Sequence, residues 1–292
     1  MSWVRRFVGN RGAMIGALLV SGLILIALLG IAPRHDPLVP DIHDGLSEVG
    51  APLPPSGDAL LGTDHFGRDV WARLATGAGT SLTIAAIATL ISMVLGVAVG
   101  LVAGYFGGWI DNALMRLVDL VLSFPMLLLA ILLAALLREA DLAWSSAPIV
   151  FTLAAVGWTA TARVVRSKAL VLARSEMVVA ARSIGANATR IIVHHIAPNV
   201  IGVIVVMTAA GFAQNLLAES VLSYLGLGLQ APHPTWGTML YEGRAYYRTA
   251  PHLVIVPGVA IITAVIAFKL VAEGLRSVLD PGHELAEAGD RA

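Results

Sequence analysis

Long apolar runs without charged residues dominate the sequence. They cover residues 14–32, 80–104, 120–137, 143–162, 200–218 and 253–268, and Leu270 to Ala272 extend the last run beyond Lys269. About 20 apolar residues span the hydrocarbon core of a bilayer as a helix. The runs lack the polar face that a period of 3.6 gives to a helix of a soluble domain. The pattern therefore predicts an all-α membrane protein with six transmembrane helices.

The first run also has features of a signal peptide, because Arg5, Arg6 and Arg11 precede it. Its apolar stretch is longer than the apolar region of a signal peptide, and residues 30–33 make a poor cleavage site. We therefore favour an uncleaved first helix.

The basic residues predict the orientation of the helices. If the N-terminus is cytoplasmic, most basic residues fall in cytoplasmic segments, and the loop after the first helix becomes an acidic outer loop. The basic residues between the fourth and fifth helices are Arg163, Arg166, Lys168, Arg174, Arg182 and Arg190. The positive-inside rule favours this arrangement, which places both termini in the cytoplasm.

Composition excludes several other classes of protein. Apolar residues make up 57% of the chain and charged residues 13%, and 19 basic residues balance 19 acidic ones. Such a chain is neither disordered nor a nucleic-acid-binding domain. The sequence has no Cys, so thiol redox chemistry and thiolate metal sites are excluded.

Loop composition suggests three parts. Residues 33–79 are rich in Pro, Gly and Asp, which predicts an irregular loop. We expect residues 1–79 to form an N-terminal helix with an outer loop, residues 80–282 a five-helix core, and residues 283–292 a cytoplasmic tail. In the second helix, the spacing of Gly96, Gly100 and Gly104 suits close helix packing, inside the bundle or in a dimer seam. We favour the bundle.

Residues 163–198 form a basic segment between the fourth and fifth helices. Ser175 can cap a short helix that Gly185 ends, and Asn187 can cap a second short helix over residues 188–195, which Pro198 stops. The segment is either a solvated linker or a docking element for a soluble partner. Its caps and its apolar face favour docking.

This segment resembles the EAA loop of ABC-importer permeases. The matching positions are Glu176, Ala180, Ala181 and Gly185, followed by Ile196, Ala197, Pro198 and Asn199. The resemblance implies a coupling helix that sits in a groove of an ATP-binding subunit. It assigns the ATPase-coupling role to Glu176, Ala180, Ala181, Gly185, Ile196 and Pro198.

Three further stretches narrow the resemblance to the dipeptide/oligopeptide/nickel permease group. They are residues 61–69, residues 219–228 with 232–237, and residues 268–276 with 279–281; Lys269 replaces the usual Asn. Together the matches cover residues 1–282. They imply the type I importer permease fold and the second, C-type permease subunit, in the cytoplasmic membrane of a prokaryote.

The resemblance also implies partners and a substrate. We expect a homologous second permease subunit, cytoplasmic ATP-binding subunits, an extracytoplasmic binding protein and a surrounding lipid bilayer. Peptides are the expected substrate, with nickel or another small solute as the alternative. ATP and Mg would bind to the partner subunits, because Lys168 and Lys269 do not lie in a Walker A motif. We therefore expect no cofactor on this chain and no enzymatic activity of its own.

The remaining polar residues give weaker signals. Glu219 ends an apolar run, either as a proton site of a secondary transporter or as a carboxylate held by Ser220 or Ser223; we favour the second. Arg116 and Asp119 can pair on one helix face. The eight His residues lack the i, i+4 spacing of helical metal ligands, so no metal site is assigned. The sequence identifies no substrate-path residues.

Overall fold

The computed structural model describes residues 7–33, 35–138, 146–230 and 232–279. Within these ranges the regular structure is helical, apart from two isolated bridges between residues 46 and 69. Five helical stretches are long and apolar enough to cross a membrane. Their main helices are α2 (Arg11–Leu29), α3 (Val70–Phe106), α6 (Ala147–Leu172), α9 (Ala197–Tyr224) and α11 (His252–Leu279). The predicted all-α membrane fold is therefore confirmed.

The sixth span is a bent pair of helices. α4 (Gly108–Leu122) and α5 (Met126–Arg138) meet at 86°, so the helix predicted over residues 120–137 is broken into two pieces. Pro125 lies at the break. Proline cannot donate a backbone hydrogen bond, and it disfavours helical geometry at Phe124 before it. The predicted fourth helix began at residue 143, and residues 143–145 lie outside the described ranges.

α3 is much longer than its apolar run predicts. It begins at Val70, where the Asp69 side chain accepts a hydrogen bond from the Trp71 N–H at 3.0 Å. Arg73 lies inside the helix, although a charged residue was not expected there. Its side chain is buried and paired with acids. The division predicted after residue 79 consequently falls inside α3.

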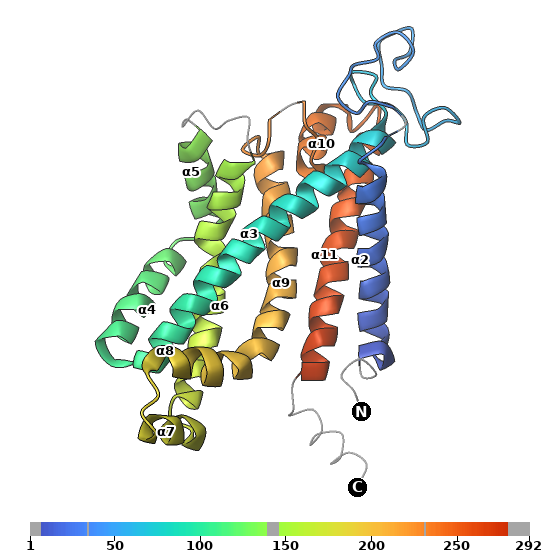
Figure 1. The fold of residues 1–292 in the computed structure, drawn as a ribbon. Coiled ribbons are helices and arrows are strands. Elements are labelled where there is room, and N and C mark those ends of the chain that lie inside the picture. Colours follow the sequence, from blue (N-terminus) through green and yellow to red (C-terminus); the bar gives the residue numbers. More distant parts are fainter. Residues whose placement is uncertain (1–6, 34, 139–145, 231, 280–292) are drawn as a thin grey trace.

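Figure 1 shows how the helices are arranged. α3 crosses the bundle diagonally, with α2 beside α11 on one side and α4 with α5 on the other. We call one end the α10 end, because it carries α10 (Trp236–Gly243) and the irregular segment before α3. The opposite, α7 end carries α7 (Glu176–Ser183) and α8 (Ala188–Ile191), and there α2 begins and α11 ends. The relative placement of these parts agrees with the predicted topology.

The glycine series of α3 packs inside the molecule. A Cβ atom on Gly96 or Gly100 would lie 2.6–2.7 Å from the carbonyl oxygen of Trp158 or Ala162 on α6. A Cβ atom on Gly104 would lie 2.5 Å from the Cβ of Ala169. These approaches are too close for any side chain, so the glycines allow α3 to touch α6. The packing supports the bundle interpretation over a dimer seam.

Candidate coupling segment

α7 packs one face against the bundle and exposes the other. Val178 and Ala181 are buried in an apolar cluster that includes Val165 and Ala169 of α6. Ser175 occupies the predicted cap position, but its hydroxyl donates to the Leu172 carbonyl oxygen at 2.7 Å and makes no cap bond. α7 is thus fixed by packing from behind.

The end of α7 is a Schellman motif. Gly185 has φ +85°, and its N–H donates to the Arg182 carbonyl at 3.0 Å, while the Ala186 N–H donates to the Ala181 carbonyl at 3.0 Å. This geometry requires a residue that tolerates positive φ. It leaves Ile184, just before the turn, 86% exposed.

The helix after α7 runs into α9 without stopping. Asn187 caps α8 as predicted, accepting from the Arg190 N–H at 2.8 Å. The π-helical turn Ile192–Ile196 then joins α8 to α9, so Pro198 does not stop the helix, contrary to the prediction. Pro198 has no N–H to donate, and it lies in the first turn of α9, where this loss is tolerated. In the same turn Asn199 Nδ2 donates to the His195 carbonyl at 2.7 Å.

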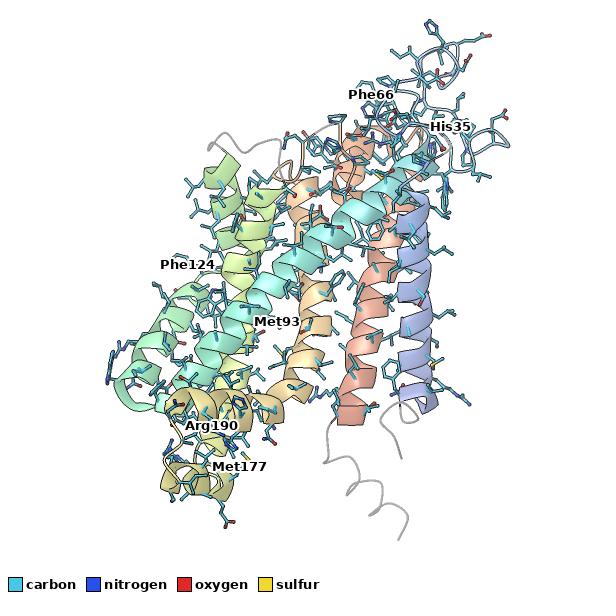
Figure 2. The ribbon with its side chains drawn as sticks, in the orientation of Figure 1. His35, Phe66, Met93, Phe124, Met177 and Arg190 are labelled. Atoms are coloured by element: carbon cyan, nitrogen blue, oxygen red, sulfur yellow. The ribbon has the colours of Figure 1, made fainter. Side chains whose placement is uncertain are left out.

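The six predicted coupling residues therefore divide into two sets. Ala181 and Ile196 are buried and hold the segment on the bundle. The exposed ones are Glu176, Ala180, Gly185 and Pro198. Apolar side chains accompany them on the surface: Met177, Val179 and Ile184 are 38%, 54% and 86% exposed. Figure 2 shows Met177 and Arg190 at this end of the molecule.

Two ion pairs tie α4 to α6 near the coupling segment. Arg166 forms a bidentate pair with Asp111, with Nη2 2.6 Å from Oδ2, and Arg163 pairs with Asp119. The predicted pair of Arg116 with Asp119 is therefore wrong. A partner on the adjacent helix is available to Asp119 because α4 lies against α6.

Glu219 is fully buried near the α10 end of α9. The Ser223 hydroxyl donates to Oε1 at 2.7 Å, and Ser220 lies 3.4 Å from Oε2. Thr235 before α10 and Ser81 of α3 also lie beside the carboxyl group. Ser81 in turn accepts from the Trp236 N–H at 3.1 Å. Glu219 thus joins three helices, which fits the structural interpretation that the sequence favours.

At the α10 end, two arginines and two acids form a buried network. Arg68 Nε is 2.7 Å from Asp64, and Arg68 and Arg73 reach the same oxygen of Glu242 at 3.0 and 2.8 Å. Both arginine side chains are at most 4% exposed. The network connects the irregular segment, α3 and α10 into one unit.

His65 lies beside this network. Burial lowers the pKa of the imidazole below its ordinary value of 6.5, while Asp64 and Glu242 act in the opposite direction. Ligand atoms of His65, Asp64 and Glu242 lie within 4.8 Å of one another. Arg68 and Arg73 already neutralise both carboxylates, so the local charge disfavours a cation here.

Comparison with known proteins identifies the family. Residues 96–284 match the family model described as binding-protein-dependent transport system inner membrane component. The chain belongs to this family. It is 37% identical to the dipeptide transport system permease protein DppC of Alkalihalophilus pseudofirmus, over 93% of this chain and 86% of the relative. It is also 37% identical to the glutathione transport system permease protein GsiD of Pectobacterium atrosepticum, over 95% and 89%.

A solved structure supports the fold of this permease. The inward-facing MetNI methionine ABC transporter matches with a TM-score of 0.55 and 18% identity, over 70% of this chain and 95% of that one. The importer-permease fold expected from the sequence is therefore confirmed. The permease is a membrane-embedded transport component with several apolar helices.

The sequence does not point to four polar residues that the structure brings into sites. Glu242 completes the arginine network, although it carries no motif of its own. The signal in the sequence was the pair Arg68 and Arg73, because two buried positive charges need a second carboxylate besides that of Asp64. Ser92, Gln214 and Asn215 line a cavity inside the bundle. Nothing in the spacing along the chain links Ser92 to the other two residues.

Proposed function

We propose that this permease is one transmembrane subunit of an ATP-driven importer of peptides across the cytoplasmic membrane of a prokaryote. The family match and relatives named for dipeptide and glutathione transport support this function. The alternative substrates are nickel and other small solutes. We expect a homologous second permease subunit to complete the translocation path.

The exposed surface of α7 is the observation that carries the proposal. A short helix, packed from behind and bearing exposed Met177, Val179 and Ile184, suits a groove on a soluble partner better than solvent. We assign this surface to a cytoplasmic ATP-binding subunit. ATP-driven movement of that subunit would push α7 and α8 as a rigid element and rock α6 and α9.

This assignment sets the orientation. The α7 end faces the cytoplasm, where the basic residues Arg174, Arg182 and Arg190 are favoured. Both termini are then cytoplasmic. The three-part division into residues 1–79, 80–282 and 283–292 remains our proposal for how the chain is organised, with the tail beyond the described ranges.

An extracytoplasmic binding protein would dock at the α10 end. The irregular segment there exposes the apolar side chains of Val39, Ile42 and Leu60, which are 59%, 64% and 68% exposed. Acidic residues surround them, so the surface offers both apolar and charged contacts. The arginine network holds this segment on α3 and α10, so docking force would reach the bundle.

Purification of the complex tests the proposal. The permease should co-purify with ATP-binding subunits encoded with it, and the reconstituted complex should hydrolyse ATP faster when the peptide-loaded binding protein is added. Peptide uptake should depend on ATP. Proton-driven uptake by this chain alone would overturn the proposal and favour a secondary transporter.

Glu219 offers a second discrimination from a secondary transporter. The Glu219→Gln variant keeps a carbonyl acceptor for Ser223 but cannot carry a proton between two sides. We expect ATP-dependent uptake by this variant to continue, measured over the same pH range as the unmodified complex. Abolished uptake in a well-folded variant would support a proton site at Glu219.

A further inference from the structure

A cavity lies at mid-height in the bundle. Its volume is about 320 Å³, and α3, α6, α9 and the break between α4 and α5 contribute its walls. Figure 2 shows two of its lining residues, Met93 on α3 and Phe124 at the break. The other side chains used below are those of Ser92, Gly157, Gln214 and Asn215.

The cavity presents polar atoms that lack a full set of partners. Ser92 is 1% exposed, and its Oγ has no hydrogen-bond partner. Asn215 is 3% exposed and donates through Nδ2 to Thr89 Oγ1 at 2.9 Å, which fixes its amide. A buried hydroxyl without a partner is costly in a membrane protein. A ligand or a water molecule in the cavity would satisfy this hydroxyl.

A glycine packs closely against these polar atoms. A Cβ atom on Gly157 would lie 2.8 Å from Ser92 Oγ and 3.5 Å from Asn215 Oδ1. Unlike the α3 glycines, Gly157 faces polar side-chain atoms rather than a neighbouring backbone. A larger residue at this position would press on Ser92 and stand between the two polar groups and the cavity.

Gln214 of α9 and the break between α4 and α5 add further polar groups to the cavity at membrane depth. Gln214 is exposed near the middle of α9, where contact with lipid would leave its amide unsatisfied. The helix break at Phe124 exposes irregular backbone at the same cavity, which is tolerated when it lines an aqueous space. None of the lining residues is charged.

We propose that this cavity is the contribution of this chain to the solute path, and that Ser92, Asn215 and Gln214 hydrogen-bond the amide groups of the passing peptide. This inference rests on the proposed function. Neutral donors and acceptors match peptide bonds, which every peptide shares. The cavity therefore binds the backbone of the peptide and accepts different peptide side chains.

Cysteine accessibility tests the location of the path. The chain has no Cys, so the Gln214→Cys variant gives it a single thiol. In the complete reconstituted importer, a charged, water-soluble thiol reagent should label this variant, and a transported dipeptide with its binding protein and ATP should suppress the labelling. The control is Ile262→Cys on α11, at a side chain that is 60% exposed outside the cavity, which should stay unlabelled.

Three results would overturn the inference. The first is labelling of Gln214→Cys only by a lipid-soluble reagent, because the position would then face lipid. The second is labelling of the isolated chain but not of the assembled importer, because the second permease would then fill the cavity. The third is labelling that the peptide does not change.

Uptake measurements test the hydrogen bonds. The double variant Ser92→Ala with Gln214→Leu should lower the amount of peptide imported per ATP about tenfold, as expected for the loss of two hydrogen bonds. The matched control is Thr208→Val on α9, whose hydroxyl donates to the Ile204 carbonyl at 2.8 Å and lies outside the cavity lining.

Different results would overturn the proposed function and the assignment of the cavity. If the unmodified complex shows no ATP hydrolysis stimulated by the binding protein, the proposed function fails. If the hydrolysis is normal and the double variant imports peptide as well as Thr208→Val does, only the assignment of the cavity fails.

Discussion

Single residues determine the shape of the coupling segment. Gly185 adopts φ +85° and closes the Schellman motif at the end of α7. A side chain there would meet no atom within 4 Å, so backbone strain and partner contact, rather than internal space, limit the choice of residue. The strain of a residue with a Cβ in this conformation is about 1 kcal/mol.

The Gly185→Arg variant should abolish peptide uptake while the protein remains in the membrane. The long side chain would project into the surface that we assign to the ATP-binding subunit. Asn tolerates positive φ, so Gly185→Asn is the control that should retain most of the uptake. Normal uptake by Gly185→Arg, with a normal amount of protein in the membrane fraction, would contradict the docking assignment.

His65 makes the α10 end sensitive to acid. Because burial lowers the pKa of its imidazole below 6.5, the folded state binds fewer protons than the unfolded state near this pH. The contribution of the neutral imidazole to stability is therefore fully present above pH 6.5. This contribution declines as the pH falls through 6.5 toward the lower pKa of the folded state. Thermal unfolding of the purified protein between pH 5 and 8 should show this decline, and the His65→Gln variant should show less of it.

At the scale of elements, close contact between α3 and α6 organises the bundle. Gly96, Gly100 and Gly104 lie on one face of α3 and meet α6 along its length. Membrane helices associate largely through such packing, because lipid is as apolar as their side chains. The ion pair of Arg166 with Asp111 then attaches α4 to the same helix.

Gly100→Ala should destabilise the protein by about 1–3 kcal/mol, the cost of overpacking a tight contact. Its Cβ would lie 2.7 Å from the Ala162 carbonyl oxygen and 2.8 Å from the Val165 Cβ. The matched control is Gly258→Ala on α11, where a Cβ meets nothing within 4 Å. Thermal unfolding in detergent should separate the two variants, and equal melting temperatures would contradict the packing argument.

For the whole molecule, the arginine network at the α10 end connects parts that are distant along the chain. Glu242 of α10 accepts hydrogen bonds from Arg68 and Arg73, which lie about 170 residues before it. Asp64, Arg68 and Arg73 are buried, and a buried charge without a partner is strongly destabilising. The network therefore fixes the irregular segment, α3 and α10 together.

Glu242→Gln should destabilise the protein by about 3–5 kcal/mol, because it leaves a buried arginine charge uncompensated. Asp119→Asn is the control, since its pair with Arg163 has side chains 61% and 51% exposed and should contribute at most about 1 kcal/mol. Both variants can be compared by thermal unfolding. A similar small effect of the two substitutions would show that the network is not important for stability.

The sequence by itself determined the membrane class, the apolar segments and the short helices of the candidate coupling segment. These depend on run length, caps and local spacing, as at Asn187 and Gly185, and local energetics decide them. The bend at Pro125 follows from the proline itself, although the predicted apolar run passes through it. The tertiary structure alone decided the extension of α3 past Arg73. It also paired Asp119 with Arg163 and placed Ser92, Gln214 and Asn215 around one cavity. Each of these depends on a neighbour that is distant in sequence, and no local pattern reports which helices will meet.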